Sequence, residues 1–281
     1  MEYTKYMSTQ IMAIINTSPD SFAGDGITVS DEEPLKNHIQ TALDQGADLL
    51  DIGGQSTRPG AVIIDIEEEI RRVVPAVTIA RQLTDKPISV DTFKPAVAEA
   101  ALKAGATIVN DITGCADPAM IEFVKNSGCQ VVIMHMRGTP ETMSRLTDYP
   151  EGVVSAAKTF LFNQAEKLVE AGIKKENIIL DPGIGFAKTA SQSFELTHHI
   201  QEFTGKGYRV LYGASNKSFI GKALAVNGEP APVVDRAVGT VVVQSLAMMG
   251  GVDIVRVHDV ASAVQTRIVT EAITGSRKIT L

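Results

Sequence analysis

The stretch that decides the fold is residues 46–58, Gly-Ala-Asp-Leu-Leu-Asp-Ile-Gly-Gly-Gln-Ser-Thr-Arg. A glycine that suits the end of a helix comes before a short apolar run, and two glycines and a polar loop follow that run. Nearly continuous apolar runs are typical of parallel strands that are covered on both faces. The stretch therefore predicts a buried strand over residues 48–52.

The same arrangement recurs along the whole chain. We predict strands over residues 10–15, 48–52, 87–90, 107–109, 130–134, 177–180, 209–212 and 253–257. Amphipathic segments lie between them; Ile66, Ile70, Val73 and Val77, for example, recur at helical spacing. Eight strand–helix units in 281 residues predict one α/β domain over residues 1–281, a closed (β/α)₈ TIM barrel. An open doubly wound sheet is the alternative.

Composition and charge narrow the possible functions. Apolar residues make up 44% of the chain, enough for one large core, and the net charge of -7 disfavours a nucleic-acid partner or an anionic membrane. No apolar stretch reaches the ~18 residues that span a bilayer. The two cysteines, Cys115 and Cys129, lack the spacing of a zinc site or a disulfide framework, and residues 1–6 lack the apolar core of a signal peptide. We therefore expect a cytoplasmic protein.

Polar side chains follow every predicted strand. In chain order they are Asn16; Thr57 and Arg58; Asp91; Asn110 and Asp111; His135 and Arg137; Asp181; Ser215 and Lys217; Arg256 and His258. In a barrel these endings converge at the C-terminal ends of the strands, where barrel enzymes keep their chemistry. The sequence thus predicts an active site at that end.

Acids and an amide form one group within this set. Asp91, Asn110 and Asp181 offer paired acceptors and a donor, which suit the edge of a planar heterocycle with an amino group and ring N–H groups. Residues of these types at strand ends also serve as helix N-caps, and Asn110 with Asp111 fits that alternative equally well.

Cations form a second group. Arg58, Lys217, Arg256 and His258 suit phosphate groups and the negative charge that develops on a leaving group. Lys217 and Ser218 also begin a helix, whose free N–H groups suit a carboxylate. The alternative is a set of solvated surface cations.

The end of the first predicted strand offers one ligand for a metal ion. Asn16 can give one oxygen ligand to Mg²⁺ while substrate phosphates and water supply the others. The chain has no cluster with transition-metal spacing, so we expect no permanent metal. It also lacks a nucleophile elbow, a phosphate-binding Walker loop and a dinucleotide fingerprint.

The motifs together resemble those of the dihydropteroate synthases. The most specific match is Gly-Gly-Gln-Ser-Thr-Arg-Pro-Gly over residues 53–60. The similarity extends, in family order and without a large gap, over residues 16–22, 46–60, 89–92, 109–112, 134–138, 180–186, 215–221 and 255–260. The resemblance implies small-molecule substrates: 6-hydroxymethyl-7,8-dihydropterin pyrophosphate and 4-aminobenzoate would condense to dihydropteroate and pyrophosphate.

The resemblance also implies residue roles. Asp91, Asn110 and Asp181 would hold the pterin edge, with Lys217 reaching the ring and Arg256 over its face. The pyrophosphate and Mg²⁺ would be held by Asn16, Thr57, Arg58, Arg256 and His258. The aminobenzoate would be framed by Thr57, Arg58, Pro59, Phe186, Lys217 and Ser218. By the same resemblance, the reaction would be a dissociative substitution. Its catalytic residues would be Arg58, Asp91, Lys217 and Arg256.

Loop closure and assembly follow from the same resemblance. Residues 22–28 and 55–62 would close over the intermediate. The family suggests a homodimer, for which the helices expected over residues 235–249 and 261–273 offer apolar faces; those faces could equally pack on the barrel.

Two departures from the family pattern concern the substrate loops. Asn216 stands where an arginine is usual, and the acidic residue of the first loop, Asp25, lies one place later than is common. From these two departures we hypothesise that this chain binds 4-aminobenzoate or its sulfonamide mimics with altered affinity. Two rival functions remain: a corrinoid-dependent methyltransferase acting on methyltetrahydrofolate, and a non-catalytic pterin-binding paralogue. The Ser-Thr-Arg-Pro loop and the Lys217–Ser218 pair disfavour the first rival.

Overall fold

Eight parallel strands close into a barrel, in the order in which they occur along the chain. The computed structural model describes residues 8–17, 32–58 and 60–277. The strands are β1 (Gln10–Asn16), β2 (Leu49–Gly53), β3 (Ile88–Asp91), β4 (Ile108–Asp111), β5 (Gln130–Met134), β6 (Ile178–Asp181), β7 (Arg209–Tyr212) and β8 (Ile254–Val257). Pairing of β1 with β8 completes the closure, which confirms the predicted (β/α)₈ barrel and excludes the open sheet.

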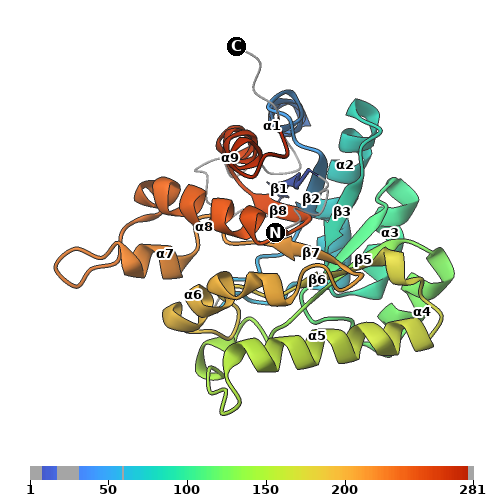
Figure 1. The fold of residues 1–281 in the computed structure, drawn as a ribbon. Coiled ribbons are helices and arrows are strands. Elements are labelled where there is room, and N and C mark those ends of the chain that lie inside the picture. The colour runs from blue at the N-terminus through green and yellow to red at the C-terminus, as the bar shows by residue number, and fades with distance from the viewer. Residues whose placement is uncertain (1–7, 18–31, 59, 278–281) are drawn as a thin grey trace.

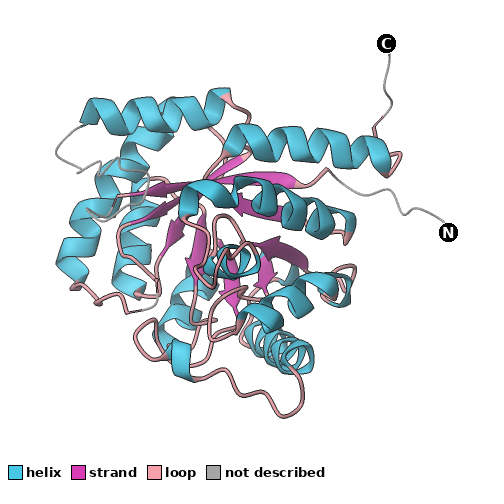
Figure 2. Cartoon of the chain, turned by 90° about the vertical axis from the view of Figure 1, so that its left-hand side faces the viewer, coloured by secondary structure: helices cyan, strands magenta, loops and turns pink. Residues whose placement is uncertain are grey.

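Helices cover the outside of the barrel, as Figures 1 and 2 show from two sides. They are α1 (Glu32–Asp44), α2 (Ile66–Leu83), α3 (Pro95–Ala104), α4 (Pro118–Ser127), α5 (Val153–Glu170), α6 (Ala190–His198), α7 (Ser218–Ala223), α8 (Ala237–Met249) and α9 (Val260–Ile273). A 3₁₀ turn, η4 (Val233–Arg236), comes before α8, so the helix expected from residue 235 starts two residues later. Gly105 ends α3 in a left-handed conformation, with a φ of 119°.

The strand bounds agree with the prediction to within one or two residues, and β5 and β7 agree at both ends. Five strands begin one residue later than predicted, and five end one or two residues later. Asp91, Asp111 and Asp181 are the last residues of their strands rather than the first residues of loops. Acidic residues seldom occur in strands, which is why the apolar pattern placed these strand ends too early.

Two layers of apolar side chains hold the barrel together. One fills the interior, with Met12, Leu49, Ile108, Val132, Ile179, Leu211 and Ile254. The other lies between the strands and the helices and contains most of the buried residues. Among the described residues, no helix combines the length and apolar character that crossing a membrane requires.

Candidate active site

Strand alternation creates a polar layer directly above the apolar interior. Successive side chains of a strand point to opposite faces, so residues two apart share a face. Asp51, Asn110, Asp181 and Arg256 each come two residues after a member of the interior cluster. These four polar side chains therefore point inward at the C-terminal end of the barrel.

Arg256 lies at the centre of this layer. Its Nε donates to Oδ2 of Asp51 at 2.5 Å, and one terminal nitrogen donates to Oδ2 of Asp91 at 2.8 Å. Asn110 donates from Nδ2 to the same oxygen of Asp51 at 3.2 Å. Residues from β2, β3, β4 and β8 are thus joined in one hydrogen-bonded cluster.

Asp51 is a site residue that the sequence analysis missed. It is fully buried in the middle of β2 and holds both Arg256 and Asn110. A signal was present, because a charged residue interrupts the apolar run Leu-Leu-Asp-Ile. A fully buried carboxylate of this kind needs a charged or hydrogen-bonding partner.

The cluster leaves acceptors available. Oδ1 of Asp51 and Oδ1 of Asp91 are buried and have no hydrogen-bond partner among the described residues. A buried carboxylate oxygen without a donor is costly, and a ligand that brings N–H groups would remove that cost. The arrangement therefore suits a ligand with several donors along one edge.

The loop after β6 forms a second wall. Oδ1 of Asp181 accepts a hydrogen bond from the backbone N–H of Gly183 at 2.7 Å. Gly183 has a φ of 68°, and a Cβ there would lie only 2.1 Å from the carbonyl oxygen of His135, so only glycine fits. Lys217 donates to the carbonyl of Ile184 and lies 4.5 Å above the ring of Phe186.

Burial and charge shift the pKa values of these groups. Burial raises the pKa of Asp91 to about 7, against the opposing attraction of Arg256. Burial also raises the pKa of Asp181, while Lys217 opposes that rise. Burial lowers the pKa of Lys217 to about 8, and the negative charge of Asp181 opposes this shift. Asp91, Asp181, Lys217 and Arg256 act on one another electrostatically, so they share one site.

His258 lies at the open edge of this site, beside the cations. Its Nδ1 and the hydroxyl of Ser215 are 3.0 Å apart, and its backbone N–H donates to the same hydroxyl at 3.2 Å. Desolvation, together with the positive charges of Arg256 and Arg58, lowers the pKa of His258 to about 4. The ring is therefore neutral at pH 7 in the free protein, whereas the sequence analysis grouped it with the cations.

The remaining predicted residues come at or after the ends of β1, β2 and β7. Asn16 ends β1, and its Oδ1 would be 3.7 Å from a Cβ placed on Gly53 of the neighbouring strand, with Asp91 beside the same position. Thr57 is half-buried, and Arg58 is close enough to His258 to affect its pKa. Ser218 is exposed at the start of α7. Pro59 and the loop over residues 22–28 lie outside the described residues.

Asn216 contacts α8 rather than the polar centre. Its backbone has a φ of 56°, a left-handed conformation that asparagine tolerates well. Its N–H donates to the hydroxyl of Thr240 at 3.2 Å, and its carbonyl accepts from Arg236 at 2.9 Å. The residue that replaces the family's usual arginine thus fastens the loop after β7 to α8.

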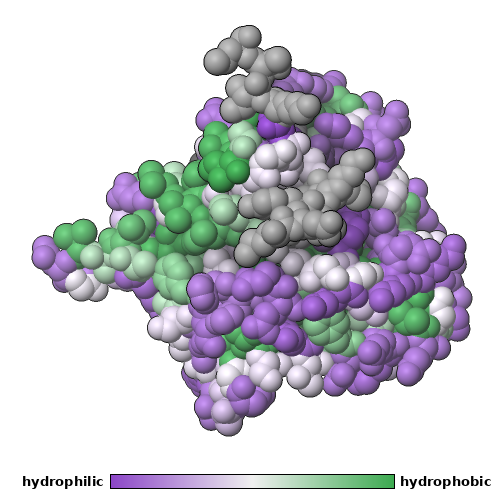
Figure 3. Space-filling view, in the orientation of Figure 1, coloured by the Kyte–Doolittle hydropathy of each residue, from purple (hydrophilic) through white to green (hydrophobic). Residues whose placement is uncertain are grey.

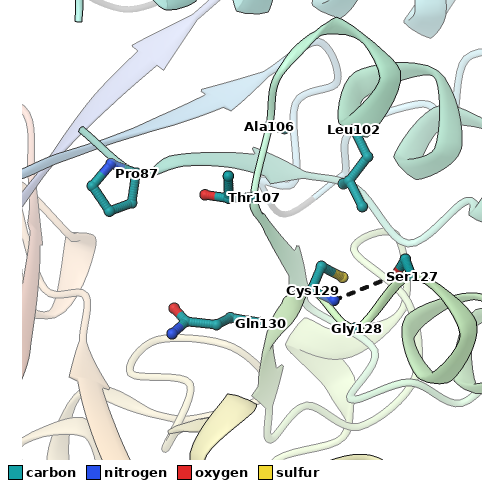
Figure 4. Close-up of a pocket in the computed structure, with 8 residues that line it drawn as sticks. All are labelled: Pro87, Leu102, Ala106, Thr107, Ser127, Gly128, Cys129 and Gln130. Carbon is teal, nitrogen blue, oxygen red and sulfur yellow. Dashed lines mark hydrogen bonds between the residues drawn. The ribbon is translucent and has the colours of Figure 1, made fainter. Parts of the chain in front are cut away.

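A separate hollow lies at the opposite end of the barrel (Figure 4). Its volume is about 430 Å³, and its lining includes Pro87 and Thr107, which precede β3 and β4, and Gln130, which begins β5. It holds no charged side chain. Because the polar cluster is at the other ends of these strands, the hollow takes no part in the site described above.

A closed barrel with inward acids, an amide and cations at the C-terminal ends of its strands defines a barrel enzyme for a nitrogen heterocycle and an anion. The family model described as pterin binding enzyme matches residues 12–258. The dihydropteroate synthase of Synechocystis sp. is 42% identical over 94% of this chain and 90% of its own length. The chain belongs to the pterin-binding enzyme family, and within it to the dihydropteroate synthases.

Solved structures agree in fold as well as in sequence. A Yersinia pestis dihydropteroate synthase with a sulfonamide drug complex has a TM-score of 0.88 at 37% identity, covering 95% of both chains. The Xanthomonas albilineans dihydropteroate synthase with 4-aminobenzoic acid has a TM-score of 0.85 at 37% identity, covering 94% of this chain and 93% of that one.

Proposed function

We propose that this chain condenses 6-hydroxymethyl-7,8-dihydropterin pyrophosphate with 4-aminobenzoate, giving dihydropteroate and pyrophosphate. It is a transferase of the dihydropteroate synthase family. The observation that carries the proposal is the hydrogen-bonded cluster of Asp51, Asp91, Asn110 and Arg256, facing Asp181 and Lys217 across one end of the barrel.

The pterin edge is assigned to the buried acids and amide. Asp91 and Asp181 accept hydrogen bonds from the amino group and ring N–H groups, and Asn110 both donates and accepts. The unpartnered Oδ1 of Asp91 supports this assignment, because a bound pterin would supply the donor that the described protein groups do not. Arg256 lies against one side of this edge and Lys217 approaches from the other.

The pyrophosphate is assigned to the cationic side, where Arg58, Arg256 and His258 lie near one another. Asn16 would give one amide oxygen to Mg²⁺, and the donor chemistry fits, because this ion commonly takes one or two protein oxygens together with phosphates and water. Bound there, Mg²⁺ would neutralise part of the charge on the departing pyrophosphate. The structure describes no group of three His, Cys, Asp or Glu residues suited to a metal.

The aminobenzoate is assigned to the space between two loops. Thr57, Arg58 and Pro59 come from the loop after β2, whereas Phe186, Lys217 and Ser218 come from the loops after β6 and β7. The bond from the pterin methylene carbon to the pyrophosphate oxygen breaks, and pyrophosphate leaves with the bonding electrons. The aromatic nitrogen forms the new bond to the methylene carbon and loses a proton to water. Asp91 and Asp181 stabilise the positive charge that spreads from the methylene into the ring.

Pyrophosphate release tests this function against its rivals. The purified chain, with magnesium chloride and both substrates, should release one pyrophosphate per dihydropteroate formed. A non-catalytic paralogue would bind pterin without releasing pyrophosphate. A corrinoid-dependent methyltransferase would demethylate methyltetrahydrofolate instead. Either result would refute the proposal.

The assembly proposed is a homodimer formed through α8 and α9. Exposed apolar side chains recur along one face of α8, at Val238, Val242, Leu246 and Met249. Val269 and Ile273 on α9 are also exposed, and the two helices pack together. Apolar atoms gather over this part of the molecule in Figure 3. Large exposed apolar patches commonly mark interfaces, which supports the pairing.

Light scattering during gel filtration tests the dimer. Leu246→Asp should shift the wild-type dimer to a monomer, because a carboxylate cannot be desolvated at an apolar interface. Val169→Asp on α5, a partly exposed position away from α8 and α9, is the control and should stay dimeric. A monomeric wild type would overturn the pairing.

We also propose that the enzyme is cytoplasmic, which its two free cysteines support.

A further inference from the structure

The loop between β2 and α2, residues 56–63, is closed at its base by a side chain. Gln55 precedes the loop and Ile64 follows it. The backbone N–H of Ile64 donates to Oε1 of Gln55 at 3.1 Å, so the two stems are joined directly. The loop itself carries Thr57 and Arg58.

Lys94 is bound at the same point. Its Nζ donates to Oε1 of Gln55 at 2.9 Å, to the carbonyl of Ile64 at 2.6 Å and to Oε2 of Glu69 at 2.6 Å. An ammonium group has three donors, and all three are used. Both stems of the loop and the first turns of α2 therefore share one cation.

The partners of this cation are shielded from water. The Glu69 side chain is 2% exposed and that of Lys94 is 11% exposed. A buried carboxylate of this kind requires a charged partner, so the contact between Glu69 and Lys94 holds both side chains in place. We call Gln55, Ile64, Glu69 and Lys94 the stem clasp.

Neighbouring contacts limit movement of the first stem. A Cβ on Gly54 would lie 2.8 Å from Cγ2 of Val73, so the backbone here lies directly on α2. Arg72 also donates to the carbonyl of Gly54 at 3.1 Å. The stem is therefore held from α2 on one side and by Lys94 on the other.

The stem clasp is also connected to the strand that carries Asp91. Lys94 follows Asp91 by three residues, and its backbone N–H donates to the hydroxyl of Thr92 at 3.2 Å. Farther along the loop, the N–H of Gly60 donates to the carbonyl of Pro140 after β5, at 3.1 Å. The loop is thus connected at its base to β3 and farther along to the loop after β5.

We propose that Lys94 is a positioning residue, which holds the loop over residues 56–63 in the conformation that presents Thr57 and Arg58 to the second substrate and the pyrophosphate. This role rests on the proposed function of that loop. Fixing a binding loop beforehand removes an ordering cost that each binding event would otherwise carry. Lys94 acts through the loop and does not itself touch substrate.

Two variants open the stem clasp in different ways. Lys94→Met removes the cation, whereas Gln55→Leu removes only the shared acceptor and leaves the pair of Lys94 with Glu69 intact. Lys86→Met is the control: Lys86 precedes β3 at the other end of the barrel and also donates to a backbone carbonyl, that of Ala47. The control should behave as wild type.

Hydrogen exchange followed by mass spectrometry gives the first readout and does not depend on any activity. Amides of residues 56–63 should exchange at least tenfold faster in Lys94→Met and Gln55→Leu than in wild type. Exchange in β3 and β4 should be unchanged in Gln55→Leu. Wild-type exchange in the loop of Gln55→Leu would overturn the proposal, whatever reaction the enzyme carries out.

Kinetics give the second readout. KM for 4-aminobenzoate should rise at least tenfold in both variants, with kcat reduced less. The Kd for 6-hydroxymethylpterin, which lacks the pyrophosphate, should stay within twofold of wild type. A purely structural lysine would instead lower Tm in Lys94→Met and leave both KM values and Gln55→Leu unaffected. If wild type shows no turnover, the proposed function fails while the exchange result still decides the role of Lys94.

Discussion

Replacing Asp91 by asparagine should separate stability from activity. In the folded protein, Asp51 and Asp91 both approach the one guanidinium of Arg256. Burial raises the pKa of Asp91 to about 7, whereas an aspartate in an unfolded chain titrates near ~3.9. The folded state therefore binds this proton more tightly than the unfolded state does.

The sign and size of the effect follow by linkage. A raised carboxyl pKa stabilises the folded protein fully below pH ~3.9, and this stabilisation is lost as pH rises to about 7. Each pKa unit corresponds to about 1.4 kcal/mol, so wild type should lose about 3 kcal/mol from this group between pH 5 and pH 8. The amide of the Asp91→Asn variant would not titrate. Its buried Nδ2 would cost about 1–3 kcal/mol at every pH, and this cost cancels in the comparison.

Urea denaturation near pH 5 and near pH 8 measures the difference. The free energy of unfolding of Asp91→Asn, relative to wild type, should improve by about 3 kcal/mol between the two pH values. Activity should nevertheless fall by about a thousandfold, because the amide no longer stabilises the positive pterin. Asp85→Asn, at an exposed position between α2 and β3, is the control. A relative stability that does not change with pH would refute the account of Asp91.

Four further predictions concern Lys217 and two asparagines of the site. Lys217→Ala should lower kcat/KM by about a thousandfold with an unchanged circular dichroism spectrum, and near-normal turnover would contradict its role. In wild type, kcat/KM should fall as pH rises above about 8, because Lys217 then loses its charge; a constant rate up to pH 10 would exclude it as the required cation. Asn16→Ala should raise the Mg²⁺ concentration for half-maximal rate about tenfold, and an unchanged requirement would place the ion elsewhere. For Asn216→Arg, inhibition constants for sulfonamides should differ from those of the parent, and equal constants would remove the hypothesis that Asn216 alters this affinity.

The barrel was predictable from the sequence because its signals are local. Apolar runs mark strands that are buried on both faces, and the glycines before them mark helix ends. The polar endings were predictable as well, because eight strands of one barrel end at the same face. Arg256 and Asp91 could therefore be placed in one site although 165 positions separate them.

The features of the site that could not be predicted from the sequence depend on contacts between distant segments. Asp51 has no charged partner near it in the sequence. Its partner, Arg256, comes close only when the barrel closes. The lowered pKa of His258 depends on burial and on Arg256 and Arg58 in space, so this shift could not be inferred from residue type. Lys94 could not be singled out from the sequence, because its three partners come from other parts of the chain.

A crystal structure with bound dihydropterin pyrophosphate and Mg²⁺ tests the central claim most directly. The ring should lie inside the C-terminal end of the barrel, with its amino edge within hydrogen-bonding distance of Asp91, Asn110 and Asp181 and its phosphates beside Arg256. A pterin bound outside this polar layer, with those acids contacting only protein and water, would contradict the account.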